Sequence, residues 1–558
     1  MASTSPKIRI LRAAGAALGL LLATLPAPGQ QETAGEETFS EAIEVSVVSL
    51  DVFVTDKKGK PLTGLTREDF EVYEDGKPVE ITNFYVETSE RPPATGAGSA
   101  PAAQGAPEAV PRPQDQRLRL VIFMDDVNTR LESRAVVLNK LDEFLAGTLR
   151  PGDQVMLVRY DRKLDVRRAF TDDLGQLAAD LEELKKVSAD LRSRVSSRTN
   201  ARMDVFSVLR AGGRRDIHVE SRLQAYAEQE AAIVAGALDA LGEVVSWLAG
   251  VPGRKALLYV SDGLALEPGY ELYEAYSNIP RGNSRISSVA SVQNDLTDRF
   301  RKLTAHASRN RVTFYPLEAS GGGGADAWQE YTMNAQNGLR FLAQDTGGRA
   351  LLNAADPLLA LRLLSEDLAA SYSLGYQPQR EGDEREHKIE VKVKVKGARV
   401  RHRQWYRDKT LGESVAERAL AVMRFGPEDN PLEAKLEIGE QKAKEGGVLV
   451  PVRVRVPISK LYLTPQEGSR TGSLRLFVVA SGAGAVTPVR ETEVVTVSIP
   501  EAEAAGVGRE YVHDVGITLK PGSYAVGVAV RDEAGAVTSY LRKEFEVGVG
   551  EAKAATTP

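Results

Sequence analysis

Two aspartates, each placed directly after a strongly apolar run, are the residues best suited to do chemistry in this chain. The runs are Leu118–Asp126 (LRLVIFMDD) and Lys255–Gly263 (KALLYVSDG), so Asp125 and Asp262 each stand where a buried strand would end. In an open α/β sheet, ligands bind in the crevice beyond the carboxyl ends of the strands. The pattern therefore predicts one crevice over both carboxylates.

Oxygen-bearing side chains beside the first aspartate extend this pair toward a metal site. Mg²⁺ prefers an octahedron of hard oxygens and usually keeps several waters, so a few protein oxygens are enough. Asp125, Thr129 and Asp262 supply that minimum for Mg²⁺ or Mn²⁺, and Asp126 or Asn128 are substitutes. The alternative is that the two strand-end carboxylates cap helix N-termini or accept hydrogen bonds from loop N–H groups. The sequence leaves both interpretations open.

Other signatures of catalysis or cofactor binding are absent from the sequence. The 5 histidines are scattered, and none has the H-E-x-x-H spacing of a zinc helix. There is no Gly-x-Ser-x-Gly elbow and no Walker loop, and the run Gly321–Gly324 lacks the Lys-Ser/Thr sequel. With 0 cysteines, disulfides, thiolate metal sites and a cysteine nucleophile are excluded. We therefore predict no catalytic residue and no cofactor-binding residue.

The elements that must position the two aspartates follow an alternating pattern from residue 117 to about residue 356. Predicted strands alternate with predicted helices, which is typical of a parallel sheet with crossover helices. Gly347 and Gly348 are expected to shape the turn into the last strand. The predicted strands are Leu118–Met124, Gln154–Tyr160, Lys163–Ala169, Ala256–Ser261, Val312–Pro316 and Arg349–Leu352, and the predicted helices are Ala135–Leu145, Leu174–Val187 and Arg222–Ala249. This pattern predicts a doubly wound, mostly parallel, Rossmann-like α/β sheet.

Segments rich in β-strand patterns flank the α/β region. Residues 42–90 are too few to fold alone without disulfides, so we expect them to pair with residues 371–407 in a split β-sandwich. Residues 430–548 contain short strand patterns separated by turns, which is typical of a second β-sandwich. The Pro, Ala and Gly-rich residues 91–116 are predicted to be a disordered linker, and residues 549–558 a loose tail.

Residues 1–30 have the features of an export signal. Lys7, Arg9 and Arg12 precede the apolar run Ala13–Ala27, which is shorter than the roughly 20 apolar residues that span a bilayer. No other stretch of the 558 residues is expected to span a membrane, so the mature chain should be periplasmic or extracellular. The net charge of -6 gives no reason to expect a nucleic-acid partner.

Several motifs, in the same order along the chain, resemble a group of secreted bacterial proteins related to the von Willebrand factor type A (VWA) family. The resemblance covers roughly residues 42–407 and implies a VWA-like domain over residues 117–370. Its motifs are Val52–Phe84 (VFVTDKKGKPLTGLTREDFEVYEDGKPVEITNF), Phe170–Asp173 (FTDD), Pro252–Gly263 (PGRKALLYVSDG), Leu342–Arg349 (LAQDTGGR), and Tyr372–Pro378 with His387–Tyr406.

The resemblance also implies a particular kind of site. In the VWA family the first strand ends in Asp-x-Ser-x-Ser, a later strand ends in Asp-Gly, and a loop threonine completes a Mg²⁺ site that captures a partner's carboxylate. Asp125 and Asp262 match this pattern, Thr129 stands for the second serine, and Val127 replaces the first. Thr199 is the candidate for the loop threonine. The implied site is a degenerate metal-dependent adhesion site.

The function expected from these observations is non-enzymatic binding. We expect an exported adhesion or binding protein whose VWA-like domain engages a protein or cell-surface ligand. One alternative is a hydrolytic enzyme that uses the carboxylates of Asp125 and Asp262 for acid and base work. Another is a purely structural role in the cell envelope.

Overall fold

The computed structural model describes most of the chain after residue 46. The described residues are 47–88, 117–186, 217–277, 294–320, 329–378, 385–426 and 430–548, the last range with short gaps, together with Met203, Ser207 and Asp383. The predicted export signal, the linker 91–116, Thr199, the glycine run 321–324 and the tail 549–558 therefore lie outside the described residues.

A sheet of five strands forms the centre of the α/β domain, in the order β7-β6-β5-β8-β9. Strand β5 runs parallel to β6 and to β8, β8 runs parallel to β9, and β7 is antiparallel to β6. Every residue of β5 and β8 is buried, which explains the unbroken apolar runs Leu120–Met124 and Ala256–Val260 inside them. The strands are β5 (Leu118–Asp125), β6 (Gln154–Tyr160), β7 (Leu164–Thr171), β8 (Arg254–Ser261) and β9 (Val312–Glu318). The prediction of an α/β domain with a mostly parallel sheet is confirmed.

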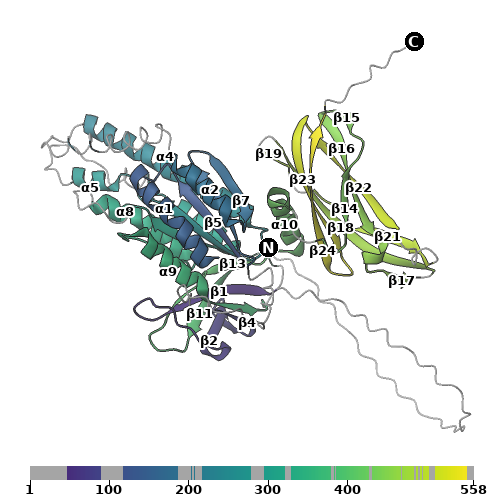
Figure 1. Cartoon of the computed structure of the whole chain (residues 1–558), viewed down its shortest axis with the longest axis horizontal. Helices are drawn as coiled ribbons and strands as arrows, with labels where there is room; N and C mark the ends of the chain where they lie inside the picture. The colour runs from purple at the N-terminus through teal and green to yellow at the C-terminus, as the bar shows by residue number, and fades with distance from the viewer. Residues whose placement is uncertain are drawn as a thin grey trace, which may run out of the picture. The chain divides into compact units, whose positions relative to one another are not determined.

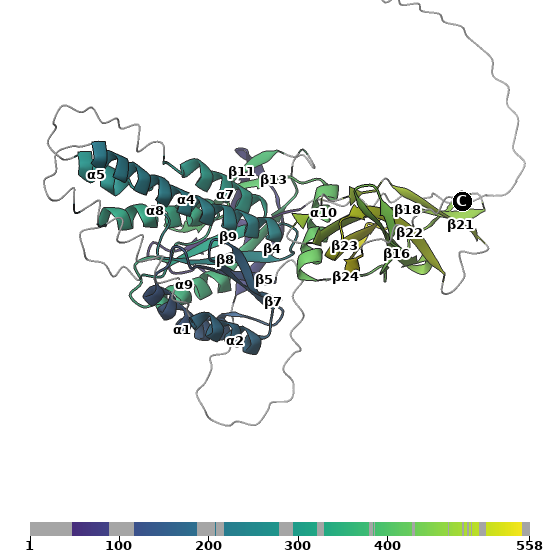
Figure 2. The ribbon, with the colours of Figure 1, turned by 90° about the horizontal axis from the view of Figure 1, so that it is seen from above.

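Helices cover both faces of this sheet (Figures 1 and 2). One face packs against α1 (Leu131–Thr148), α2 (Leu174–Lys185) and α9 (Pro357–Ala369). The other face packs against α4 (Ile217–Leu248), α7 (Thr297–Arg309) and α8 (Gln329–Asp345), and α5 (Tyr270–Ser277) follows β8. Sequence patterns did not predict α7 and α8. The strand predicted at residues 349–352 is a single parallel bridge between Leu351 and Leu317.

Helix α4 corrects one expectation about membrane spans. Its segment Ser221–Leu248 is long and apolar enough to cross a bilayer when length and composition alone are considered, so the expectation that no internal stretch qualifies was wrong. The apolar composition has another physical cause. Leu241, Val244, Val245 and Leu248 are fully buried in the core between α4 and the sheet. A helix that covers a sheet needs such a face.

Two antiparallel sheets of four strands form a β-sandwich from segments before and after the α/β domain, in the orders β12-β1-β10-β4 and β13-β11-β2-β3. Strand β1 pairs with β10 and β12, and β2 pairs with β11. Apolar side chains from both sheets share one core. The elements are β1 (Val48–Thr55), η1 (Arg67–Asp69), β2 (Phe70–Glu74), β3 (Lys77–Val79), β4 (Ile81–Thr88), β10 (Ala370–Tyr376), β11 (Glu386–Val393), β12 (Arg399–Arg401) and β13 (Trp405–Arg407).

The remaining strands form a second antiparallel sandwich. In one sheet, strand β16 pairs with β14, β15 and β22. The other sheet has the order β17-β18-β23-β24, and β19, β20 and β21 also pair with β18. Helix α10 (Leu411–Phe425) packs Val415, Ala419 and Met423 against β18, β23 and β24. The other elements are β14 (Lys435–Ile438), β15 (Lys442–Lys444), β16 (Gly447–Pro457), η3 (Ile458–Lys460), β17 (Thr464–Gln466), β18 (Ser469–Gly482), β19 (Ala485–Val486), β20 (Arg490–Glu491), β21 (Val495–Pro500), β22 (Glu510–Leu519), β23 (Gly522–Asp532) and β24 (Val537–Val547).

A buried histidine joins two acidic side chains in the first sandwich. His387 Nδ1 lies 2.8 Å from Asp75 Oδ2, and its Nε2 lies 3.0 Å from Asp383 Oδ1. The ring also stacks on Tyr406. Burial opposes the charged imidazolium, but the hydrogen bonds to Asp383 and Asp75 outweigh it and raise the pKa of His387. The hydrogen bond with His387 lowers the pKa of each partner carboxyl.

These shifts predict a pH-dependent stability. The pKa of His387 is higher in the folded protein than the value of about 6.5 in the unfolded chain. Its contribution to the free energy of unfolding is therefore fully present below about pH 6.5 and is lost as the pH rises through the folded-state pKa. The lowered aspartate values give stability that is present above about pH 3.9 and lost as the pH falls through the folded values. His387→Gln should therefore lower the free energy of unfolding most between about pH 3.9 and about pH 6.5 and least near about pH 9, as measured by urea denaturation.

His306 offers a control with the opposite sign. Burial lowers the pKa of His306, whose Nε2 lies 2.9 Å from Ser246 Oγ. The stability difference between the wild type and His306→Gln should shrink as the pH falls below about 6.5, whereas the difference for His387→Gln should grow as the pH falls from about 9 to about 6.5 and then level off. A difference for His387→Gln that stays constant between about pH 9 and about pH 6.5 would contradict the assignment.

Candidate functional site

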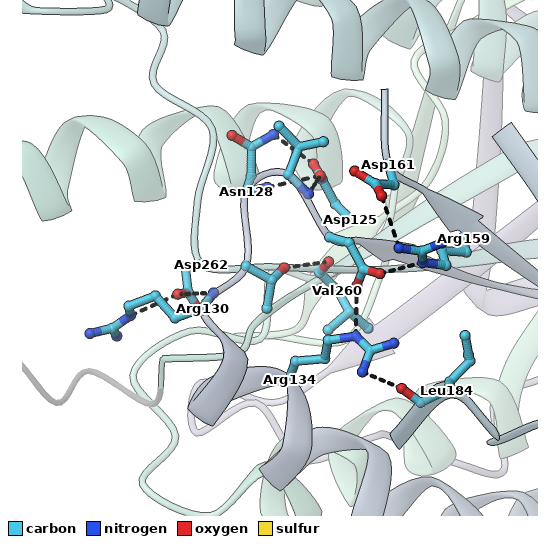
Figure 3. A network of polar contacts seen from close by, with 12 residues as sticks. Asp125, Asn128, Arg130, Arg134, Arg159, Asp161, Leu184, Val260 and Asp262 are labelled. Carbon is cyan, nitrogen blue, oxygen red and sulfur yellow. Dashed lines mark hydrogen bonds and ion pairs between the residues drawn. The ribbon is translucent and has the colours of Figure 1, made fainter. Parts of the chain in front are cut away.

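Asp125 ends β5 and organises the loop that leads into α1. Its side chain is completely buried at 0% exposure. Its Oδ1 accepts the N–H groups of Val127 and Asn128, both at 3.0 Å, and its Oδ2 accepts Asn128 Nδ2 at 2.7 Å and the Tyr259 hydroxyl at 2.5 Å. Burial raises the pKa of Asp125, and these hydrogen bonds oppose the rise. Both oxygens of the carboxylate are therefore already used to shape the loop (Figure 3).

Asp126 follows Asp125 in the chain and binds two arginines. Arg134 Nε lies 2.6 Å from Oδ1, and Arg159 Nε lies 2.5 Å from Oδ2. Arg134 also donates to the Leu184 carbonyl, and Arg159 Nη2 lies 2.9 Å from Asp161 Oδ2. Asp126 and Arg134 are almost fully buried, at 0% and 3% side-chain exposure. This network ties β5 to α1, to the end of α2 and to β6 (Figure 3).

Asp262 follows β8 and binds Arg130, the N-cap residue of α1, and Ser133 in its first turn. Its Oδ2 accepts Arg130 N and Arg130 Nε, both at 2.9 Å, and Ser133 Oγ at 3.3 Å. Its Oδ1 is buried and has no hydrogen-bond partner among the described residues. Burial raises the pKa of Asp262, and the contacts with Arg130 oppose the rise. A carboxylate at a helix N-terminus is also stabilised by the helix dipole.

The two aspartates lie at one edge of the sheet, but their carboxylates accept hydrogen bonds from different groups. Strands β5 and β8 are parallel neighbours, and the Asp262 N–H donates to the Asn128 carbonyl at 2.9 Å, so the two loops touch. Asp125 binds its own loop and Tyr259, whereas Asp262 binds Arg130. Both carboxylates thus adopt the role of loop and helix capping that the sequence left open beside metal binding.

The oxygens in this crevice do not fit a Mg²⁺ or Mn²⁺ ion. Asp125 is saturated by donors, Val127 has no side-chain oxygen, and the Thr129 hydroxyl, at 1% exposure, points to the Val260 carbonyl 3.4 Å away. The Arg130 guanidinium adds a positive charge beside Asp262 that would repel a divalent ion. Within the described part of the chain, no group of three or more His, Cys, Asp or Glu residues could hold a metal. Asp126 and Asn128, the two substitute ligands, are also occupied. Asp126 binds two arginines, and the Asn128 side-chain amide donates to Asp125.

Sequence reasoning missed Arg130, Arg134 and Tyr259 as parts of the site. Arg130 and Arg134 lie one helical turn apart at the start of α1, which is a spacing that places two side chains near one strand end. That spacing could have indicated a basic rim, although it could not assign one arginine to each aspartate. Tyr259 carries no local signal, because a tyrosine in an apolar strand is ordinary core material.

The comparisons with known proteins add little to this description. No protein-family model matches the chain, and no curated protein matches it. Among solved structures, an X-ray structure of a Northeast Structural Genomics Consortium target is similar at 14% identity over 22% of this chain and 90% of that chain, with a TM-score of 0.13. A score this low carries no argument about fold or function. The functional interpretation therefore depends on the residues of the site.

Proposed function

We propose that this chain is an exported, non-enzymatic binding protein whose α/β domain is of the VWA type. The domain engages a protein or cell-surface ligand at the crevice rim formed by residues 126–133 and Asp262. The observation that carries this proposal is the Arg130–Asp262 pair, in which a guanidinium stands beside the carboxylate where the VWA family would hold a metal. The rim is thus a degenerate metal-dependent adhesion site that works without a divalent ion.

Arg130 is suited to receive an anionic group from a partner. Its side chain is 50% exposed, and its Nε is committed to Asp262. Its two terminal nitrogens have no partner among the residues that the structure describes. An arginine held by one carboxylate keeps its planar fork oriented, and such a fork binds carboxylates in a bidentate manner. We infer that a carboxylate on the partner takes the role that the metal-bound carboxylate has in the VWA family.

The geometry gives no support to the hydrolytic alternative. A general acid or base must come within hydrogen-bond reach of the substrate. Asp125 is fully buried and already accepts four hydrogen bonds, so it has no free edge for a substrate. A structural envelope role would predict no saturable ligand at the rim, and this difference separates it from the proposed function.

The test measures binding of the purified mature chain to the cell-envelope fraction of the source cells. We expect saturable binding that a chelator does not weaken and that Arg130→Ala weakens by about tenfold or more, since one charge-assisted hydrogen-bond pair is lost. Arg301→Ala is the matched control, because Arg301 is also an exposed arginine paired with an aspartate, at 3.2 Å from Asp298. It should bind as the wild type does.

Calorimetry with Mg²⁺ and Mn²⁺ completes the experiment. We expect no saturable heat with the wild type, because the carboxylate of Asp125 is already occupied and Asp262 Oδ1 is the one unpartnered carboxylate oxygen of the described pair. A single-site heat that Asp262→Ala abolishes would contradict the metal-free rim. Envelope binding that is equally strong in Arg130→Ala, or absent in the wild type, would contradict the proposed use of the rim.

A further inference from the structure

A second polar region lies at the opposite edge of the central sheet, where β8 and β9 begin. A cavity of about 300 Å³ is lined there by seven lysines or arginines and only two acidic residues. Its walls come from the starts of β1 and β8, the turn between α7 and β9, the segment 403–409 and the start of α10. This excess of positive charge is notable in a chain whose net charge is -6.

Three of the basic residues in this cavity have little compensation from acidic side chains. Lys255 is 6% exposed, and its Nζ donates to the Val251 carbonyl at 2.8 Å. Arg403 is 9% exposed and donates to the carbonyls of Ser308 and Ser49, at 2.9 Å and 3.0 Å. Neutral carbonyls accept these hydrogen bonds but do not balance the charges.

Arg311 completes the cluster and forms a long ion pair with Asp51. Its Nη2 lies 3.8 Å from Asp51 Oδ2, beyond hydrogen-bond distance. The Nε atoms of Arg311 and Arg403 are buried and have no hydrogen-bond partner among the described residues. Lys409 is different, because its Nζ lies 2.7 Å from Glu417 Oε2. The most weakly compensated charge therefore belongs to Lys255, Arg311 and Arg403, with Asp51 as the nearest acid of Arg311.

The protonation equilibria of the cluster reflect the same imbalance. Burial, followed by repulsion from Arg311, lowers the pKa of Lys255 well below its ordinary value. Burial, again followed by repulsion from Arg311, lowers the pKa of Arg403 to about 10. Groups buried together in this way destabilise the charged state of one another unless an anion is present.

We propose that this cavity binds a small oxyanion of the phosphate or sulfate class, held by Lys255, Arg311 and Arg403. The bound anion compensates the two buried cations Lys255 and Arg403 and the partly exposed Arg311 at once, which no single side chain of the described residues does. The volume exceeds what an inorganic anion fills, so the cavity also admits a small phosphate monoester. The site is distinct from the Arg130 rim, because it lies at the amino-terminal ends of β8 and β9.

The experiment titrates the full mature chain, first dialysed into a buffer without oxyanions, with phosphate, sulfate and glycerol phosphate at constant ionic strength. We expect saturable calorimetric binding and a concentration-dependent rise in the melting temperature, since a ligand of the native state stabilises it. Comparing inorganic phosphate with glycerol phosphate decides whether the free anion or the ester is preferred. Chloride at equal ionic strength is the reference and should have no such effect.

Two variants locate the binding. Lys255→Met and Arg311→Gln should each weaken phosphate binding by about tenfold or more, as expected for one lost charge-assisted hydrogen bond. In oxyanion-free buffer, Lys255→Met should also melt higher than the wild type, because it removes an uncompensated buried charge. Arg453→Gln is the control, since Arg453 is a partly exposed arginine paired with Asp514 on the C-terminal sandwich. It should bind phosphate as the wild type does.

Each outcome decides the proposal. If Lys255→Met does not fold, Arg311→Gln alone decides, because Arg311 is a quarter exposed and less central to the packing. Phosphate and sulfate that act no more strongly than chloride would overturn the proposal. Wild-type affinity in both cavity variants would also overturn it and would leave Lys255 a neutral hydrogen-bond donor of the core.

Discussion

Replacement of Asp126 by alanine is expected to lower the free energy of unfolding by about 3–5 kcal/mol, the range observed when one partner of a buried ion pair is removed. Asp126 is fully buried and lies 2.6 Å from Arg134 Nε and 2.5 Å from Arg159 Nε. Arg134 is only 3% exposed, so in the variant its charge would remain inside the protein without an acidic partner. Urea denaturation followed by circular dichroism measures the effect.

The control for this prediction is an ion pair at the surface of the same domain. Asp165 lies 3.4 Å from Arg167, and both side chains are substantially exposed, at 45% and 34%. Exposed pairs contribute about 0–1 kcal/mol, so Asp165→Ala should change the stability little. The double variant Asp126→Ala with Arg134→Met should recover part of the loss, because it also removes the buried charge. Equal stability of Asp126→Ala and wild type would show that the network contributes nothing.

Replacement of Gly348 by alanine is expected to lower the free energy of unfolding by roughly 3 kcal/mol or more, at the upper end of the cost of overpacking. A Cβ at this position would lie 1.9 Å from the Phe314 carbonyl oxygen and 3.0 Å from Thr313 Cγ2. Because the obstacle is the backbone of β9 rather than a flexible side chain, the strand or the turn must move. Urea denaturation again measures the change.

Gly147 provides the matched control for this substitution. It lies in α1, and a Cβ built there meets nothing within 4 Å. Gly147→Ala should therefore stabilise the protein by about 0.5–1 kcal/mol, because alanine loses less conformational freedom in a helix than glycine does. If Gly348→Ala were tolerated as well as Gly147→Ala, the close approach to β9 would be wrong.

The sequence predicted the central sheet well because its signal is local. Strand Gln154–Tyr160 is buried over Val155–Val158, so a short apolar run marks it without any knowledge of neighbours. Helices α7 and α8 escaped prediction for the opposite reason. In α7 only Phe300, Leu303 and Ala307 supply buried apolar side chains, and the rest of the helix is strongly polar. A short apolar stripe in a polar segment is a weak local signal.

The two glycines of the turn at Gly347 and Gly348 are needed for different reasons, and the sequence indicates only the first reason. A Gly-Gly pair before a strand predicts a turn, and Gly347 does adopt a positive φ of 79°, which favours glycine. Gly348 does not have a positive φ, so its backbone conformation does not require glycine. The need for glycine there comes from contact with Phe314, which lies more than thirty residues earlier and is brought close only by the pairing of β9 with the segment around Leu351.

For the candidate site, the order of residues along the chain was enough to place Asp125 and Asp262 at one sheet edge, because parallel strands end together and both runs stop on a carboxylate. It was not enough to assign partners to them. The Arg130–Asp262 pair exists because α1 begins over the end of β8. The cluster of Lys255, Arg311 and Arg403 exists because three segments that are distant in the sequence meet at the edge of the sheet where β8 and β9 begin. Hydrogen bonds and charge compensation depend on distances of a few ångströms between such segments, and these distances arise only when the whole chain has packed.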